Sequence, residues 1–539
     1  TQEHCTNSLR SLSIYPMQLS NQDLSQIDED ELLNLPEEEL RYLSIKLLND
    51  LKDARERLSQ NSSNSSRPPS SEMPWDKAPI EPSNDQTQEE TDNPTETEDS
   101  AKPRPPAKKG QQQSEDANKE SQEARKPGKQ LGAQGFGRTQ KLAITDYQNH
   151  YPETCDCCHQ TLESRHAIAY AAYETINVDW ANVNHPGILI TNTKHTLYEI
   201  VCTNGHITRK EVNRSSHTQL PGITRTEWRL VGPGLAAMIV CLAYRMRTSR
   251  EHIQEFLYDW LGIKLSVGTI NNTLHESGAA AMPLEDEFIQ EIINSELLHV
   301  DETSWMEHTT FLWLWVFSTD RVTAYWIATR SAELMDNLLG EDYSGWLMSD
   351  GYSVYRKYLN RLRCWTHLLR KAKGLKESLN KDAQFFGQQT LNLLGMMIDS
   401  VRKARITPPD TPLSETYRLE LLAYQQMCVQ MKTHEHKKTA ALATEMLNDW
   451  KAIFQVLDQP HQPLTNNEAE RALRHWVILR GICYGTRSEN GTRVFAILIS
   501  VIETCRKRNQ SPWIYLAQVI ASQRSGLPVP ALPNVRVSE

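Results

Sequence analysis

Apolar residues recur along this chain with helical spacing in some stretches and in short unbroken runs in others. From Pro36 to Leu58 they fall three or four positions apart, which predicts an amphipathic helix with Pro36 near its start. The apolar face of that helix suits either packing onto the same chain or self-association in a short coiled coil. The same spacing predicts helices across residues 227–282 and 381–457, with a proline-rich break at 407–412.

A strand-rich region lies between the two long helical stretches. Aromatic and β-branched runs at 311–317 and 324–328 predict two strands joined by a polar turn, and a helix is expected from Ala332 to Leu339. A further helix is expected from Leu368 to Leu379, and a short one at 511–516 before a frayed end. Three hairpin strands followed by a helix and a parallel strand indicate a ribonuclease-H-like order.

Two short apolar runs in this region each lead to an acid. Residues 297–300 predict a strand with Asp301 at its carboxyl end, and residues 345–349 predict a second strand with Asp350 at its end. The two strands are expected to be neighbours in the sheet. The sequence therefore predicts that the carboxylates of Asp301 and Asp350 converge.

A third acid opens a predicted helix much later in the chain. Good helix formers and alternating charges follow Asn466, and Glu470 is the candidate acid. Mg²⁺ prefers oxygen ligands, so three carboxylates suit a divalent metal site. Two Mg²⁺ or Mn²⁺ ions about 3.5–4 Å apart can hold the attacking and leaving oxygens of a phosphoryl displacement.

The net charge of −10 is unevenly distributed along the 539 residues. Residues 1–100 contain 22 Asp and Glu against 8 Lys and Arg, whereas residues 101–539 contain 50 bases against 46 acids. The overall acidity therefore does not argue against nucleic acid as a partner. No apolar run reaches the roughly 18–20 residues of a membrane span, so we expect no membrane contact and a cytoplasmic location.

Cysteines and a histidine form two close pairs. Cys155 and Cys158 have C-x2-C spacing, and Cys202 and His206 follow after 43 intervening residues with C-x3-H spacing. Such a set of thiolates and an imidazole predicts a structural Zn²⁺ site. Three substitutes remain open: Cys157 for either of its neighbours, and His159 or His195 for His206. Buried cysteines without metal are the alternative.

Two stretches are candidates for DNA binding. Glycines and cations alternate in residues 125–138, and Lys126, Lys129 and Arg138 could contact phosphates, unless the stretch is only a solvated linker. A glycine turn and the capping residue Ser266 precede the second helix of a possible helix-turn-helix. Asn271 and Asn272 would read bases there, and an ordinary helical bundle is the competing interpretation.

Several runs, in order, resemble the large subunit of the insertion-sequence-66 family of DDE transposases. They are His299-Val300-Asp301-Glu302-Thr303, Ser349-Asp350-Gly351-Tyr352, Cys364-Trp365-Thr366-His367-Leu368-Leu369-Arg370 and the run from Asn466 to Arg474. The resemblance covers most of the chain and implies that Asp301, Asp350 and Glu470 are the catalytic acids of a ribonuclease-H-like core. Thr465 departs from the family's usual Asp, and Glu468 is a rival for the third ligand.

The resemblance also implies supporting residues, cofactors and partners. His367 and Arg370 would lie beside the scissile phosphate, with core packing as the alternative for His367, and Arg471 and Arg474 would assist the third acid. Arg487 would contact phosphate unless its loop is simply exposed. We expect two Mg²⁺ or Mn²⁺ per active site, structural Zn²⁺, double-stranded DNA of element ends and target, a homodimer, small accessory proteins of the same element, and a bacterial host.

The expected organisation is multidomain α+β with a catalytic core split by a helical insertion. Its segments are an acidic N-terminal region with an amphipathic helix (1–60), a disordered linker (61–125), a glycine-rich basic arm (126–150), a zinc-finger-like module (151–222), a helical DNA-binding region (223–288), the first part of the core (289–380), the insertion (381–457), the second part of the core (458–510) and a tail (511–539). The expected function is metal-dependent DNA cleavage and strand transfer. The alternatives are a nuclease or resolvase that does not join DNA, and a catalytically silent DNA-binding regulator.

Overall fold

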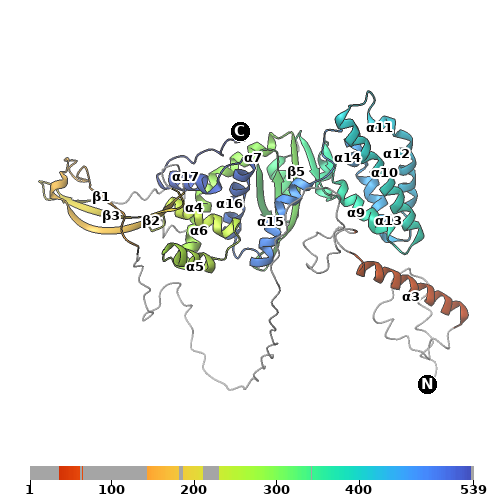
Figure 1. Ribbon diagram of the computed structural model, residues 1–539, viewed down its shortest axis with the longest axis horizontal. Coiled ribbons are helices and arrows are strands. Elements are labelled where there is room, and N and C mark those ends of the chain that lie inside the picture. The colour runs from red at the N-terminus through yellow and green to blue at the C-terminus, as the bar shows by residue number, and fades with distance from the viewer. Residues whose placement is uncertain are drawn as a thin grey trace, which may run out of the picture. The chain divides into compact units, whose positions relative to one another are not determined.

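The computed structural model describes residues 36–60, 64, 142–180, 186–210, 230–340 and 343–535, which form helices and two mixed β-sheets (Figure 1). The amphipathic helix is present as α3 (Glu37–Leu58), and its Glu56 forms an ion pair with Lys438 at 3.2 Å. The predicted basic arm with Lys126, Lys129 and Arg138 lies outside the described residues, and so does the linker apart from Asn64. No described helix is both long and apolar enough to cross a membrane.

The smaller sheet is built around two long antiparallel strands. Residues Ile168 to Asp179 of one strand face Glu199 to Leu189 of the other, with a bulge near Ala169. Two short strands, Asp146–His150 and Ile207–Arg209, pair with the second long strand on the side away from the first. The four strands are β1 (Asp146–His150), β2 (Ile168–Asp179), β3 (Leu189–Val201) and β4 (Ile207–Arg209).

A helical bundle follows the smaller sheet. It contains α4 (Pro233–Val240), a π-helical turn (Cys241–Arg245), α5 (Arg250–Leu261), α6 (Val267–Ala281) and α7 (Glu285–Ile293). Ser266 caps α6 as predicted, by accepting a hydrogen bond from the backbone N–H of Thr269. However, α6 is largely buried and contacts α4, α5 and two C-terminal helices. This burial fits the bundle alternative, and DNA binding by the helix stays a prediction.

The central sheet has the strand order β7-β6-β5-β8-β9, with β5 to β7 antiparallel and β8 and β9 parallel to β5. The strands are β5 (Leu297–Glu307), β6 (Thr310–Ser318), β7 (Thr323–Ala328), β8 (Trp346–Ser349) and β9 (Arg361–Arg363), and α8 (Glu333–Leu339) connects β7 to β8. One prediction was wrong, because β5 does not end at Asp301. It continues to Glu307 since its second half pairs with β6, whereas β8 pairs only with Leu297 to His299.

The predicted helices after the central sheet form a bundle with its own hydrophobic core, separate from that of the sheet. The helices are α9 (Trp365–Lys376), α10 (Lys381–Ile406), α11 (Leu413–Thr416), α12 (Arg418–Met431), α13 (Lys437–Asn448) and α14 (Trp450–Phe454). Figure 1 shows α10, α12 and α13 running side by side. We call α10 to α14 the helical insertion. Helix α9 begins three residues earlier than predicted and shares the same core.

Three helices complete the chain: α15 (Asn467–Cys483), α16 (Glu489–Lys507) and α17 (Pro512–Arg524). Helix α16 covers the edge of β7, where Thr504 and Ser500 side chains accept hydrogen bonds from strand N–H groups. The expected frayed end was wrong for the residues up to 535. Leu532 is buried and its N–H donates to Glu287. Arg508 and Tyr515 donate to backbone carbonyls of the same segment, so its backbone is held against the helices.

Candidate active site and metal centre

The register of the parallel strands places the first two acids opposite each other. Leu298 of β5 pairs with Leu347 of β8 and His299 pairs with Met348, so two further steps bring Asp301 level with Asp350. Neighbouring strands lie about 4.8 Å apart. Oδ1 of Asp301 accepts the N–H of Glu302 at 2.9 Å, and Oδ1 of Asp350 accepts the N–H of Tyr352 at 2.8 Å.

The third acid arrives through the docking of α15 onto β5. The side chain of Asn466, just before the helix, donates to the carbonyl of Val300 at 2.8 Å, and its Oδ1 lies 3.0 Å from Nδ1 of His299. This contact fixes the start of α15 beside the strand that carries Asp301. Glu470 lies one turn further along the helix. No role was predicted for Asn466 from the sequence, although it lies only four positions before Glu470.

Charge crowding identifies Asp301 as the centre of this group. Burial and the charges of Glu302, Asp350 and Glu470 raise the pKa of Asp301 well above its usual range. A carboxylate held near other carboxylates in a partly dehydrated position is poorly compensated unless a cation is present. We call Asp301, Asp350 and Glu470 the acid site, and its oxygen donors suit Mg²⁺ or Mn²⁺.

Glu302 lies next to Asp301 and is partly compensated by its partners, although burial and the charge of Asp350 still raise its pKa. Arg330 donates to its Oε1 through two nitrogens at 3.0 and 2.7 Å, and the hydroxyl of Tyr355 donates to its Oε2 at 2.6 Å. The guanidinium of Arg330 also lies over the rings of Trp313 and Tyr352. Asp301 therefore remains the open carboxylate of the pair. The arrangement was not predictable from the sequence, because the partners of Glu302 are 28 and 53 positions away along the chain.

The two candidates for the third ligand lie on different sides of α15. Two residues correspond to a rotation of about 200° around a helix, so Glu468 and Glu470 cannot face the same direction. Glu468 forms an ion pair with Lys507 of α16 at 2.9 Å, whereas Oε1 of Glu470 lies 3.3 Å from Nε2 of His367. The charges of Asp350 and Glu470 both act on Asp301, so Glu470 stays our candidate for the third ligand.

The supporting residues predicted for the acid site have different surroundings. The hydrogen bond from His367 lowers the pKa of Glu470. Burial acts against this shift, and the charges of His367 and Arg370 add to it. Arg471 is exposed and pairs with Glu468 at 3.5 Å, and Arg474 is exposed on α15. Arg487 is also exposed. Asn271 and Asn272 are half-buried, and Asn271 accepts a hydrogen bond from Arg250 at 2.8 Å.

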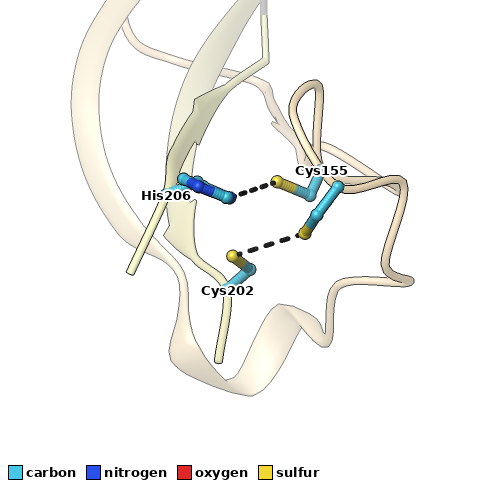
Figure 2. A group of neighbouring side chains, drawn as sticks. Cys155, Cys202 and His206 are labelled. Carbon is cyan, nitrogen blue, oxygen red and sulfur yellow. Dashed lines mark hydrogen bonds between the residues drawn. The ribbon is translucent and has the colours of Figure 1, made fainter. Parts of the chain in front are cut away.

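A second group of ligand atoms lies in turns beside the smaller sheet. Figure 2 shows Cys155, Cys202 and His206 pointing toward one another, and together with Cys158 their ligand atoms lie within 4.8 Å of each other. We call these four residues the Cys/His cluster. The Sγ atoms of Cys158 and Cys202 are 3.8 Å apart, and Sγ of Cys155 is 3.9 Å from Nδ1 of His206. Tetrahedral Zn²⁺ with Zn–S of about 2.3 Å sets S···S near ~3.8 Å, so the four residues fit this ion.

Two tight turns present these ligands. The N–H of Cys202 donates to the carbonyl of His206, and Gly205 between them has φ of +80°, which a side chain would disfavour. Backbone N–H groups of Cys158 and Cys157 lower the pKa of Cys155 to about 6, so its thiolate form is favoured at neutral pH. Cys157 is exposed, and His195 stacks against Tyr173 instead, so neither of these substitutes is in the cluster.

Comparison with known proteins gives the family context of the acid site. The sequence model of the family described as "Transposase IS66 family" matches residues 229–494, which include all three acids. The uncharacterized proteins y4qI and y4hP of Sinorhizobium fredii (strain NBRC 101917 / NGR234) are each 24% identical to this chain, over 309 and 330 residues. These alignments cover 51% and 54% of this chain, and 56% and 59% of the two relatives. The chain therefore spans less than two thirds of the length of the curated relatives that it matches.

Proposed function

The chain belongs to the IS66 transposase family, and from this premise we propose that it cleaves DNA at the ends of a mobile element and joins the freed 3′-hydroxyl to target DNA. The observation that supports this proposal most directly is the convergence of Asp301, Asp350 and Glu470 from two strands and a distant helix. The strand order β7-β6-β5-β8-β9 also suits a ribonuclease-H-like core, which the insertion would split.

Each residue of the acid site has a defined part in this proposal. Asp301, Asp350 and Glu470 would together hold the two metal ions. When bound, the two ions supply Lewis-acid activation of the attacking oxygen and stabilise the leaving oxygen. His367 would orient Glu470 through their hydrogen bond. Arg370, Arg471 and Arg474 would place positive charge near the phosphate, where charge develops during the reaction.

The remaining segments would contribute partners and positioning. We assign double-stranded DNA to the exposed Arg487 and to the predicted basic arm with Lys126, Lys129 and Arg138. Asn271 and Asn272 are less suited to base reading than predicted, since α6 is packed within a bundle. Dimerisation, accessory proteins of the same element and the domain limits given above belong to the proposal as well.

The Cys/His cluster would hold one structural Zn²⁺ per chain. Metal analysis of purified protein tests this assignment: we expect about one zinc per chain, falling to near zero in Cys158→Ser. Cys157→Ser is the matched control and should retain zinc, since Cys157 is exposed and outside the cluster. Full zinc content in Cys158→Ser, or none in the folded parent protein, would contradict the assignment.

The transposase proposal is tested with a duplex carrying the end of the element, a target plasmid and Mg²⁺. We expect a metal-dependent nick at the element end and covalent joining of the end to the plasmid. A duplex whose transferred strand ends in a 3′-deoxynucleotide is the control and should be bound but not joined. Cleavage without joining would instead indicate a nuclease or resolvase, and metal-independent binding without cleavage would indicate a DNA-binding regulator.

A further inference from the structure

An open cavity of about 470 Å³ lies between the end of β8 and the helical insertion. Asp350, Gly351 and Tyr352 line it from the central sheet. Residues at i, i+3, i+4 and i+7 of α13 line it from the insertion, and they therefore share one helix face: Ala441, Thr444, Glu445 and Asn448. The cavity is thus formed jointly by residues on both sides of the insertion boundary.

Cations outnumber acids on the lining of this cavity. Four basic side chains, Arg330, Arg356, Arg363 and Lys371, face two carboxylates, Asp350 and Glu445. The side chains of Arg330, Arg356 and Lys371 are 36%, 40% and 35% exposed, so part of each remains accessible. An arginine has five N–H donors and a lysine has three, and each of these residues uses only some of them.

Ion pairs with acidic side chains hold these cations in place. Arg356 and Arg363 each bind Asp449, at 3.0 and 3.1 Å, and Lys371 binds Glu445 at 2.6 Å. Such anchoring reduces the conformational entropy that the side chains would lose on binding an anion. The bases are therefore positioned before any ligand arrives.

Two contacts connect the cavity to the acid site. His367 lines the cavity and also contacts Glu470. Gly351 follows Asp350 directly, and a Cβ atom there would lie 2.6 Å from Nη2 of Arg363 and 3.0 Å from Oε1 of Glu445. The turn after Asp350 thus packs tightly against the anchored cations. A phosphate chain that reaches Asp350 would pass this cavity.

We propose that this cavity binds the DNA backbone next to the scissile phosphate, with the helical insertion supplying one side of the site. The proposal rests on the transposase function and adds a phosphate-binding site to it. Guanidinium and ammonium groups are the usual protein ligands of phosphodiesters, and the tyrosine ring in the lining is already covered by Arg330. The ligand chemistry is therefore backbone phosphate and not a stacked base.

The first test is the salt dependence of binding to a fluorescently labelled element-end duplex, measured in EDTA. The slope of log K against log salt is negative, and loss of one phosphate contact makes it shallower by about 0.9. We expect this change for Lys371→Ala. Lys373→Ala is the matched control on the same helix, since Lys373 is exposed and does not line the cavity, and it should keep the parental slope.

A second variant introduces an acid without removing an ion pair. Thr444 is exposed on α13 and lines the cavity, so Thr444→Glu should weaken duplex binding several-fold and slow cleavage. Gln426→Glu adds the same charge to an exposed position of α12 outside the cavity and should have little effect. If Lys371→Ala is poorly folded by circular dichroism, the Thr444 pair decides the question.

The outcomes separate this proposal from the proposed function. Parental salt slope and affinity in both cavity variants would overturn the phosphate site, even if the protein is an active transposase. A reduced slope in Lys371→Ala together with absence of cleavage by the parent protein would refute the transposase function but support the phosphate site. Because binding is measured without divalent metal, loss of catalysis does not affect this readout.

Discussion

Two clusters of buried charge lie on the two strands that flank β8, and they are built in opposite ways. On the β5 side, three carboxylates converge, and burial with like charges raises the pKa of Asp301. On the β9 side, Arg361 and Arg363 bind the buried Asp449, joined by Arg356. Burial opposes ionisation in both clusters, but in the second the arginines outweigh it and the pKa of Asp449 is lowered. Charge balance, more than burial, therefore distinguishes the two clusters: like charges dominate the first, and opposite charges offset one another in the second.

The largest expected effect comes from the uncompensated cluster. Asp301→Asn should reduce DNA cleavage by about 10⁴-fold, or ~5.4 kcal/mol of transition-state stabilisation, because it removes a carboxylate of the proposed metal site. Stability without metal should be unchanged or higher, since a carboxyl group with a raised pKa destabilises the fold once it ionises. Cleavage assays and thermal unfolding in EDTA measure the two quantities. A stable protein with parental cleavage would remove Asp301 from the active site.

Removal of the acid from the Asp449 cluster should instead lower the stability of the fold. Asp449→Asn should reduce the free energy of unfolding by about 3–5 kcal/mol, because it leaves Arg361 and Arg363 buried without their carboxylate. Urea unfolding at neutral pH measures this loss. An unfolding free energy equal to that of the parent protein would show that the network does not stabilise the fold.

The lowered pKa of Asp449 also gives a pH dependence. A carboxyl group whose pKa is lower in the folded chain contributes its full stability above the unfolded-state value of about 3.9, and this contribution is lost as pH falls through the folded-state value. The stability difference between parent and Asp449→Asn should therefore shrink as the solution is acidified below about pH 4. A difference that grows with acidity would contradict the assigned direction.

A smaller effect is expected beside the acid site, where Glu302 is partly compensated. Tyr355→Phe should reduce stability by about 1.5–3 kcal/mol, because the hydroxyl of Tyr355 donates to a charged, buried carboxylate. Arg330 remains as a partner, so cleavage should persist. Urea unfolding and cleavage assays test both statements, and loss of cleavage in a stable variant would place Glu302 in the catalytic group.

The smallest effect distinguishes the two acids of α15. Glu468→Gln should change cleavage by less than about tenfold, since its pair with Lys507 is partly exposed and such pairs contribute little. Glu470→Gln should lose as much activity as Asp301→Asn. Parallel assays of the two variants under saturating Mg²⁺ decide the matter, and the reverse order of activities would make Glu468 the third ligand.

Local patterns identified most elements and the ligand types. The strand before Asp350, the capping residue Ser266, the helices of the insertion and the paired spacing of Cys155, Cys158, Cys202 and His206 were all predictable, because each depends on residues within a few positions. Strand β9 was missed, since its three residues contain two arginines and resemble a surface segment. Those arginines can be buried because they bind Asp449. That partner lies 86 to 88 positions further along the chain, so no local pattern reveals it.

The sequence by itself determined the chemical inventory: three acids next to strands or at a helix start, and a thiolate and imidazole set in two turns. It left open whether Glu468 or Glu470 joins the acids, because both fit the same local pattern. Only the tertiary structure gives the two acids different partners, Lys507 for Glu468 and His367 for Glu470, because the contact of Asn466 with Val300 fixes the start of α15 against β5. The physical reason is that helix phase and strand register are fixed by contacts between segments, and no local pattern contains them.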